Sequence, residues 1–129
     1  MANITILEAL NRSLIATKKY VDDAVSYNKF TTISNTLTVN SIYDLGVQTS
    51  LSLTLPSGIV GDFIQVDFIS IDTPTTLTIT STSGLNGYDL TPEINKIYTL
   101  YFDWGAIGYS GDTVTYGWRY NYSEYSINN

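Results

Sequence analysis

A heptad pattern near the start of the chain constrains its fold more than any other feature. Between Thr5 and Asn28, apolar or small residues recur at alternating steps of three and four, which places a narrow stripe along one side of a helix. Thr5 and Glu8 have the spacing of a capping box, the mark of a helix start. The pattern predicts a helix that associates with its own copies as a coiled coil; a helix packed on its own domain is the alternative. The predicted oligomerisation seam consists of Leu7, Leu10, Leu14, Thr17, Val21 and Ala24.

Beyond this segment the apolar repeat changes to two residues, the period of a β-strand. Six or seven short strands without intervening helices are typical of an antiparallel sandwich or small barrel. The predicted class is therefore α+β, mainly β: an N-terminal coiled-coil helix in residues 1–30, then an antiparallel β-sandwich, jelly-roll or immunoglobulin-like, in residues 31–129. The strands are expected from Thr36 to Ser41, Leu51 to Leu55, Phe63 to Ile69, Leu77 onward, Ile97 to Trp104 and Val114 to Tyr122.

Composition excludes several classes of site. The chain has no cysteine and no histidine, which excludes disulfides, zinc–thiolate sites, thiol catalysis and Ser-His triads. No apolar run is long enough for a membrane span, and the start lacks the layout of a signal peptide, so we expect neither membrane insertion nor secretion. Beyond residue 30 there are two basic residues and nine acidic ones, a balance of −7. Such a surface repels phosphate, so we expect no nucleic-acid partner.

The acidic residues give little sign of catalysis or metal binding. Most sit at the ends of predicted strands or in turns, where aspartate caps backbone groups, and only Asp67 lies in the middle of a predicted strand. Asp67, Asp72 and Asp89 offer oxygen ligands for calcium, but their spacing is not that of a calcium-binding loop. We therefore expect a protein that is not an enzyme, with no catalytic residues, no metal and no cofactor.

Aromatic residues gather towards the end of the chain. Eight of the eleven tyrosines and both tryptophans lie between residues 88 and 125. Aromatic faces stack on sugars and are also enriched at subunit interfaces. The candidate glycan-binding or interface platform comprises Tyr109, Tyr116, Trp118 and Tyr120. The apolar and aromatic residues from Val114 to Tyr122 alternate strictly, as the buried face of a half-buried strand does. We therefore favour a place in the core or at an interface over a ligand site.

Three segments carry a resemblance to structural proteins of tailed bacteriophages. Residues 17–24, TKKYVDDA, resemble a helix that recurs in tail and head fibres and their adaptors, and two later segments resemble their small β-domains, Leu55–Gly58 with Gly61–Phe68, and Pro92–Tyr98. The resemblance implies a homotrimeric head-fibre or capsid-decoration protein, with a dimer as the alternative state. It implies attachment to the capsid or another virion protein through the N-terminus, with the β-domain projecting outward.

The expected location follows from the same resemblance. The protein would be made in the host cytoplasm and sit on the surface of the phage particle, with host surface glycans as a further partner. A receptor- or carbohydrate-binding module of a tail fibre or baseplate is the alternative function.

Overall fold

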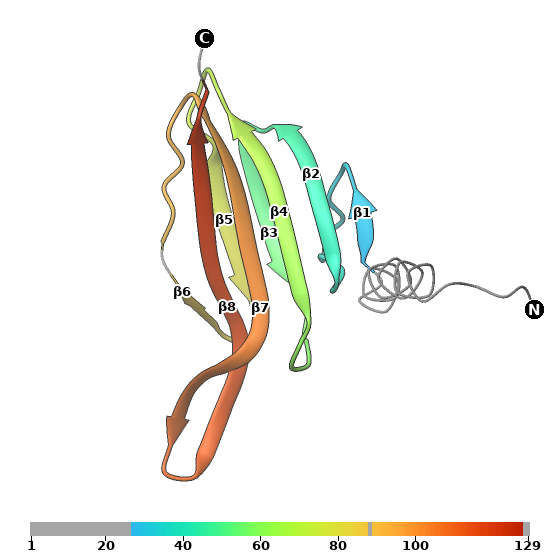
Figure 1. Cartoon of the computed structure of the whole chain (residues 1–129), viewed down its shortest axis with the longest axis vertical. Helices are drawn as coiled ribbons and strands as arrows, with labels where there is room; N and C mark the ends of the chain where they lie inside the picture. The colour runs from blue at the N-terminus through green and yellow to red at the C-terminus, as the bar shows by residue number, and fades with distance from the viewer. Residues whose placement is uncertain (1–26, 88, 128–129) are drawn as a thin grey trace, which may run out of the picture.

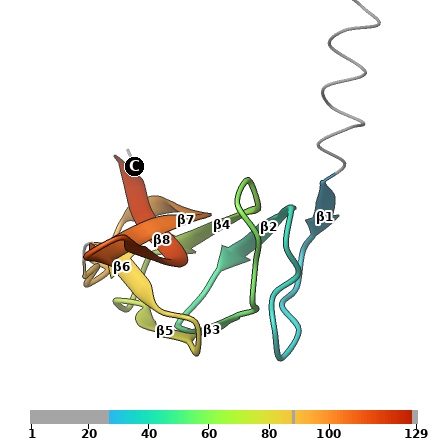
Figure 2. The ribbon, with the colours of Figure 1, turned by 90° about the horizontal axis from the view of Figure 1, so that it is seen from below.

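Every regular element that the structure describes is a β-strand. The computed structural model describes residues 27–87 and 89–127, and their strands form one six-stranded and one two-stranded sheet (Figures 1 and 2). The large sheet has the order β1-β2-β4-β7-β8-β6, and the small one pairs β3 with β5. The strands are β1 (Asn28–Phe30), β2 (Ser41–Val47), β3 (Ser50–Leu55), β4 (Phe63–Ser70), β5 (Thr76–Ser81), β6 (Leu85–Gly87), β7 (Lys96–Ser110) and β8 (Thr113–Ser126).

The chain winds between the two sheets before it forms a hairpin. From β2 to β5 consecutive strands alternate between the sheets, so β4 returns beside β2 in the same direction and β5 returns beside β3. The long β7–β8 hairpin then completes the large sheet by antiparallel pairing of β7 with β4. Figure 2 shows β3 and β5 lying together across from β4, β7 and β8.

The predicted fold class is wrong. The described residues contain no helix, and four of their six strand pairings are parallel, so the class is all-β, with a mixed large sheet and a parallel small one. The alternation of side chains fixes which face of a strand is buried, but not which strand lies beside it or in which direction. Residues 5–26 of the predicted helix lie outside the described residues, and its expected last residue, Asn28, opens β1, where its N–H donates to Asn40 O at 2.9 Å.

The first predicted strand is also displaced. Residues 36–40 are irregular, and the strand begins at Ser41, where the prediction ended it. Asn40 has a φ of +56°, a left-handed conformation that interrupts an extended chain. Leu37 is nonetheless 2% exposed, because its N–H donates to Thr54 O and holds the loop against β3.

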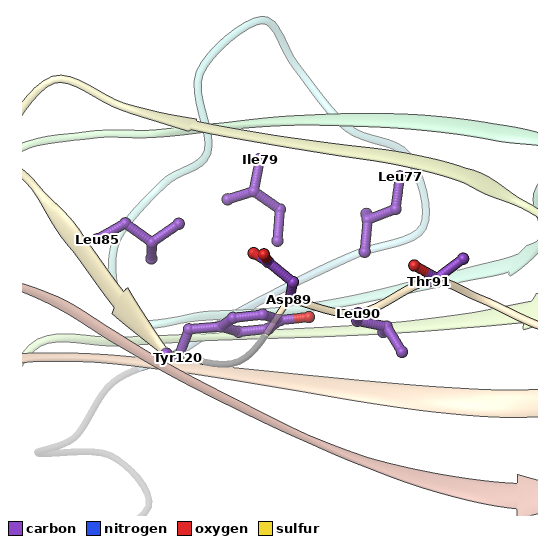
Figure 3. Close-up of a pocket in the computed structure, with 8 residues that line it drawn as sticks. Leu77, Ile79, Leu85, Asp89, Leu90, Thr91 and Tyr120 are labelled. Atoms are coloured by element: carbon purple, nitrogen blue, oxygen red, sulfur yellow. The ribbon is translucent and has the colours of Figure 1, made fainter.

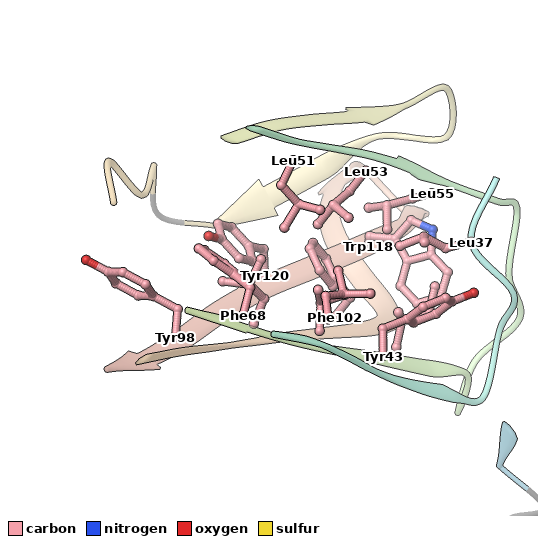
Figure 4. Close-up of a cluster of buried hydrophobic side chains, with 14 residues drawn as sticks. Leu37, Tyr43, Leu51, Leu53, Leu55, Phe68, Tyr98, Phe102, Trp118 and Tyr120 are labelled. Atoms are coloured by element: carbon pink, nitrogen blue, oxygen red, sulfur yellow. The ribbon is translucent and has the colours of Figure 1, made fainter. Parts of the chain in front are cut away.

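The core fills the space between the sheets (Figure 4). Leu51, Leu53 and Leu55 point inward from β3, and the large sheet supplies most of the remaining volume. Three of the buried aromatic side chains have hydrogen-bond partners: the hydroxyl of Tyr43 accepts from Thr38 N–H, and that of Tyr98 accepts from Glu93 N–H, both at 2.8 Å. The indole N–H of Trp118 donates to Pro56 O at 2.6 Å. The inward side chains of the large sheet are Tyr43, Leu45, Ile64, Val66, Phe68, Tyr98, Leu100, Phe102, Trp118 and Tyr120.

Leu53 offers the clearest test of this core. Its side chain is 0% exposed, so Leu53→Ala removes apolar contacts and leaves a cavity between the sheets. We expect the free energy of unfolding to fall by about 2–5 kcal/mol in urea denaturation. Val47→Ala, at a side chain 55% exposed, is the control and should change it by less than about 0.5 kcal/mol. Equal effects of the two substitutions would contradict the described core.

Candidate interaction surface at the hairpin end

The β7–β8 hairpin extends well past the rest of the large sheet. Strand β4 pairs with β7 only as far as Asp103, and β6 pairs with β8 only from Trp118 onward. Between these limits, residues 105–110 pair only with residues 113–117, and no other described strand lies beside them. We call residues 105–117 the arm (Figure 1). A two-stranded ribbon is marginally stable in water without further packing.

Glycines allow the arm to leave the sheet. Gly111 has a φ of +60° in the turn between the two strands, a conformation that glycine adopts without strain. At the base of the arm, a Cβ atom on Gly117 would lie 2.7 Å from Cδ1 of Ile107. Ile107 sits at a register shift between Ala106 and Gly108, so its side chain packs over Gly117 and anchors the arm.

The arm has one apolar face, which continues the inner face of the sheet. Tyr109 lies opposite Val114 in the register, and opposite residues of antiparallel strands project to the same side. Tyr116 precedes Trp118 by two residues on β8 and therefore shares its face. Trp118 is covered by the rest of the sandwich, whereas Tyr109, Val114 and Tyr116 are 82%, 43% and 47% exposed. The face of β8 that is buried at Trp118 is therefore exposed beyond the end of the sandwich.

A loop adds two more exposed apolar residues at this end. Residues 56–62 join β3 to β4, and Gly58 fits closely against the indoles of Trp104 and Trp118. The loop therefore closes the core, and it leaves Ile59 and Val60 72% and 68% exposed. Figure 1 places this loop and the arm at the same end of the domain. We call the combined set, Ile59, Val60, Tyr109, Val114 and Tyr116, the hairpin-end surface.

The structure separates the predicted aromatic platform into two pairs. Tyr109 and Tyr116 are exposed on the arm, while Trp118 and Tyr120 are 0% and 6% exposed in the core. The four therefore do not form one exposed surface. The predicted seam, Leu7, Leu10, Leu14, Thr17, Val21 and Ala24, lies outside the described residues.

The acidic side chains are dispersed. Asp67 accepts a hydrogen bond from the amide of Gln65, and Asp62 accepts from Ile59 N–H at 2.9 Å in the β3–β4 loop. Over residues 27–87 and 89–127, no three Asp, Glu, Cys or His side chains are grouped to hold a metal ion. The same ranges contain no helix of the length and apolarity needed to cross a membrane.

A second surface, which the sequence interpretation missed, lies on the outer face of the large sheet. Tyr101 is 46% exposed there, and the register places it between Gln65 and Asn121. The predicted strand from Ile97 to Trp104 carries apolar or aromatic residues on both faces, so nothing in the pattern singles out Tyr101. With their neighbours these residues line a shallow depression of about 230 Å³. The outer-face depression comprises Phe63, Gln65, Tyr101, Asp103, Arg119 and Asn121.

Two ion pairs occur within the described ranges, both on the large sheet. Arg119 contacts the carboxylate of Asp103 through two nitrogens, with 3.1 Å between Nε and Oδ1, at the edge of the outer-face depression. Lys96 and Glu124 are 3.0 Å apart between β7 and β8, and their hydrogen bond raises the pKa of the Lys96 ammonium. The two basic side chains of the β-domain beyond residue 30 are therefore both paired.

Comparison of the chain with known protein families, with curated proteins and with solved structures finds no match.

We expect the buried phenol of Tyr120 to reduce the stability of the fold at alkaline pH. Its burial, reinforced by Tyr122 and Asp89, raises the pKa of its phenol well above the ordinary 10.0. The native phenol then keeps its proton where the unfolded one has lost it, so the free energy of unfolding falls as the pH rises above about 10. Between about pH 8 and about pH 11, urea denaturation should show a smaller loss of unfolding free energy for Tyr120→Phe than for the unaltered protein. Some loss should remain in the variant, because burial also raises the pKa of Tyr98. An equal loss in both proteins would show that Tyr120 is not a source of it.

Proposed function

We propose that this chain is a non-enzymatic structural protein of the tailed-bacteriophage virion, a head-fibre or capsid-decoration component that assembles as a homotrimer. The resemblance of the segments Leu55–Gly58, Gly61–Phe68 and Pro92–Tyr98 supports the assignment to the virion. These segments run from the end of β3 into β4 and from the preceding loop into β7, so they belong to the sandwich. The apolar face of the arm is the observation that carries the proposal of assembly.

A second copy of the chain is the occupant that best suits the hairpin-end surface. The arm lacks the packing that a two-stranded ribbon needs, and burial of its apolar face contributes about 25 cal/mol per Å². The β-domain is acidic overall, and Asp112 lies in the turn of the arm, so most contacts between copies bring like charges together. The five side chains of the hairpin-end surface are uncharged, so contact there avoids much of that repulsion. Symmetric assemblies of identical chains are the commonest soluble oligomers. A dimer is the alternative state.

The arm provides a direct test of assembly. The double substitution Tyr109→Ser and Tyr116→Ser removes two large apolar side chains from an exposed face, so the fold should persist while assembly is lost. Light scattering on a sizing column should give the mass of a trimer for the unaltered chain and of a monomer for the variant. Tyr125→Ser, at a side chain 66% exposed on the opposite face, is the matched control and should remain a trimer. An unchanged mass in the arm variant would contradict assembly through this surface.

The outer-face depression favours a second candidate function, the receptor- or carbohydrate-binding module. Tyr101 presents a half-exposed ring on which a sugar can stack. Gln65 and Asn121 flank it with amide groups, and the Asp103–Arg119 pair adds a carboxylate and a guanidinium at its edge. These groups donate to and accept from hydroxyls. This hypothesis concerns different residues from the platform expected from the sequence.

Loss of the Tyr101 ring tests this second function. If host glycans bind in the depression, Tyr101→Ala should weaken binding by about tenfold or more on a glycan array, because it removes the stacking surface. Tyr125→Ala removes another exposed tyrosine of the same sheet face and should leave binding unchanged. Binding to no glycan across a broad panel would exclude this function, and equal losses in both variants would exclude the depression as its site.

A further inference from the structure

A cavity of about 400 Å³ opens between β5 and the segment that follows β6 (Figure 3). It exists because two strands of the small sheet face six of the large one, so the space beside β5 is incompletely filled. Its walls are largely aliphatic: Leu77 and Ile79 come from β5, and Leu85 and Leu90 come from β6 and the following segment. Its size is in the range of small-molecule sites.

Three oxygen-bearing side chains interrupt the aliphatic lining: Asp89, Thr91 and Tyr120. Tyr120 is 6% exposed, and one face of its ring stacks on Phe102 with 5.1 Å between centroids. Its hydroxyl is buried without a hydrogen-bond partner among the described residues. A buried polar group in this state costs about 1–3 kcal/mol, so a polar occupant beside it would recover free energy.

The one charged side chain that lines the cavity is that of Asp89, which is exposed to solvent. Asp89 forms no ion pair or side-chain hydrogen bond within residues 27–87 and 89–127, and its charge acts on the neighbouring phenol of Tyr120. Lys96 and Arg119 are paired with Glu124 and Asp103 on the large sheet. An anionic occupant would be repelled by this carboxylate, whereas a cationic occupant would gain an attraction that a neutral alkyl group lacks.

We infer that this cavity binds a primary ammonium group carried on an aliphatic chain. The ammonium would neutralise Asp89 and lie near the ring of Tyr120, whose face attracts cations. Its N–H groups would donate to the Asp89 carboxylate and to the Tyr120 hydroxyl, which Figure 3 shows on the same side of the cavity. The hydrocarbon stem would lie along Leu77, Ile79 and Leu90. The inference is independent of the proposed function, since it uses neither the arm nor the outer face.

This chemistry has two natural sources, a lysine side chain of another polypeptide or a free aliphatic amine. Both sources present the same feature to the cavity, an ammonium group at the end of an aliphatic chain of four or five carbons. A lysine from a partner would make the cavity part of an interface, whereas a free amine would make it a small-molecule site.

Titration of the full chain with n-pentylamine, followed by amide NMR, tests the inference. We expect saturable shifts at Asp89, Leu90 and Thr91, while 1-pentanol, which has the same stem without the charge, should produce none at equal concentration. Asp89→Asn should weaken pentylamine binding by about tenfold, the usual effect of losing a charge-assisted hydrogen bond. Asp112→Asn makes the same charge change in the turn of the arm and should alter binding by less than about twofold. Equal effects of the two substitutions, shifts with pentanol, or no shifts at these residues would each overturn the inference.

Tyr120→Phe separates binding from folding. This variant removes the orphan hydroxyl, so its melting temperature should be equal to or higher than that of the unaltered chain. Its affinity for pentylamine should nevertheless fall by about threefold, and an unchanged affinity would remove Tyr120 from the site. Titration with Nα-acetyl-lysine methylamide and with 1,5-diaminopentane then distinguishes the sources, since blocked lysine binds only if the cavity mouth admits a peptide backbone.

Discussion

The whole fold depends on one row of aromatic side chains along the β7–β8 hairpin. Phe102 stacks on Tyr120 with 5.1 Å between ring centroids, and Trp104 meets Trp118 edge-on at 5.4 Å. Such pairs contribute about 0.5–1.5 kcal/mol each beyond the area that they bury. The row gives the large sheet its inner face, and β3 and the β3–β4 loop cover it. The indole N–H of Trp118 links the large sheet to the β3–β4 loop through its hydrogen bond to Pro56 O.

The surfaces of interest arise where this row is covered incompletely. At one end the hairpin outruns the sandwich, and the same alternation that buries Trp118 exposes Tyr116 and Val114. Beside β5 the small sheet ends after two strands, which leaves the cavity of about 400 Å³ that Tyr120 lines. Assembly and ligand binding are therefore two proposed consequences of one mismatch, between a long hairpin in a six-stranded sheet and the short pair of strands opposite.

The sequence predicted strands well and their arrangement poorly. Strands at Leu51–Leu55 and Phe63–Ile69 were expected and occur as β3 and β4, because a period of two marks a half-buried strand. Strand β2 was missed although its buried side chains, Ser41, Tyr43 and Leu45, alternate. The apolar residue Ile42 on the other face hides the alternation in the sequence, and Gly46 has a positive φ. Parallel pairing was missed because it depends on the path between sheets, which no side-chain pattern records. The platform failed for the same reason: Tyr116 and Trp118 share a face, but only the position of the opposing sheet decides which is covered.

Hydrogen–deuterium exchange of the assembled protein tests the central claim, that the apolar face of the arm is buried against another copy, most directly. Unsupported two-stranded ribbons open readily, so the amides of residues 105–117 exchange within seconds if the arm stands free in water. The account predicts protection of these amides comparable to that of β4, and its loss when the protein is diluted below the concentration at which it assembles. Fast exchange along the arm while the protein keeps its oligomeric mass would contradict the account.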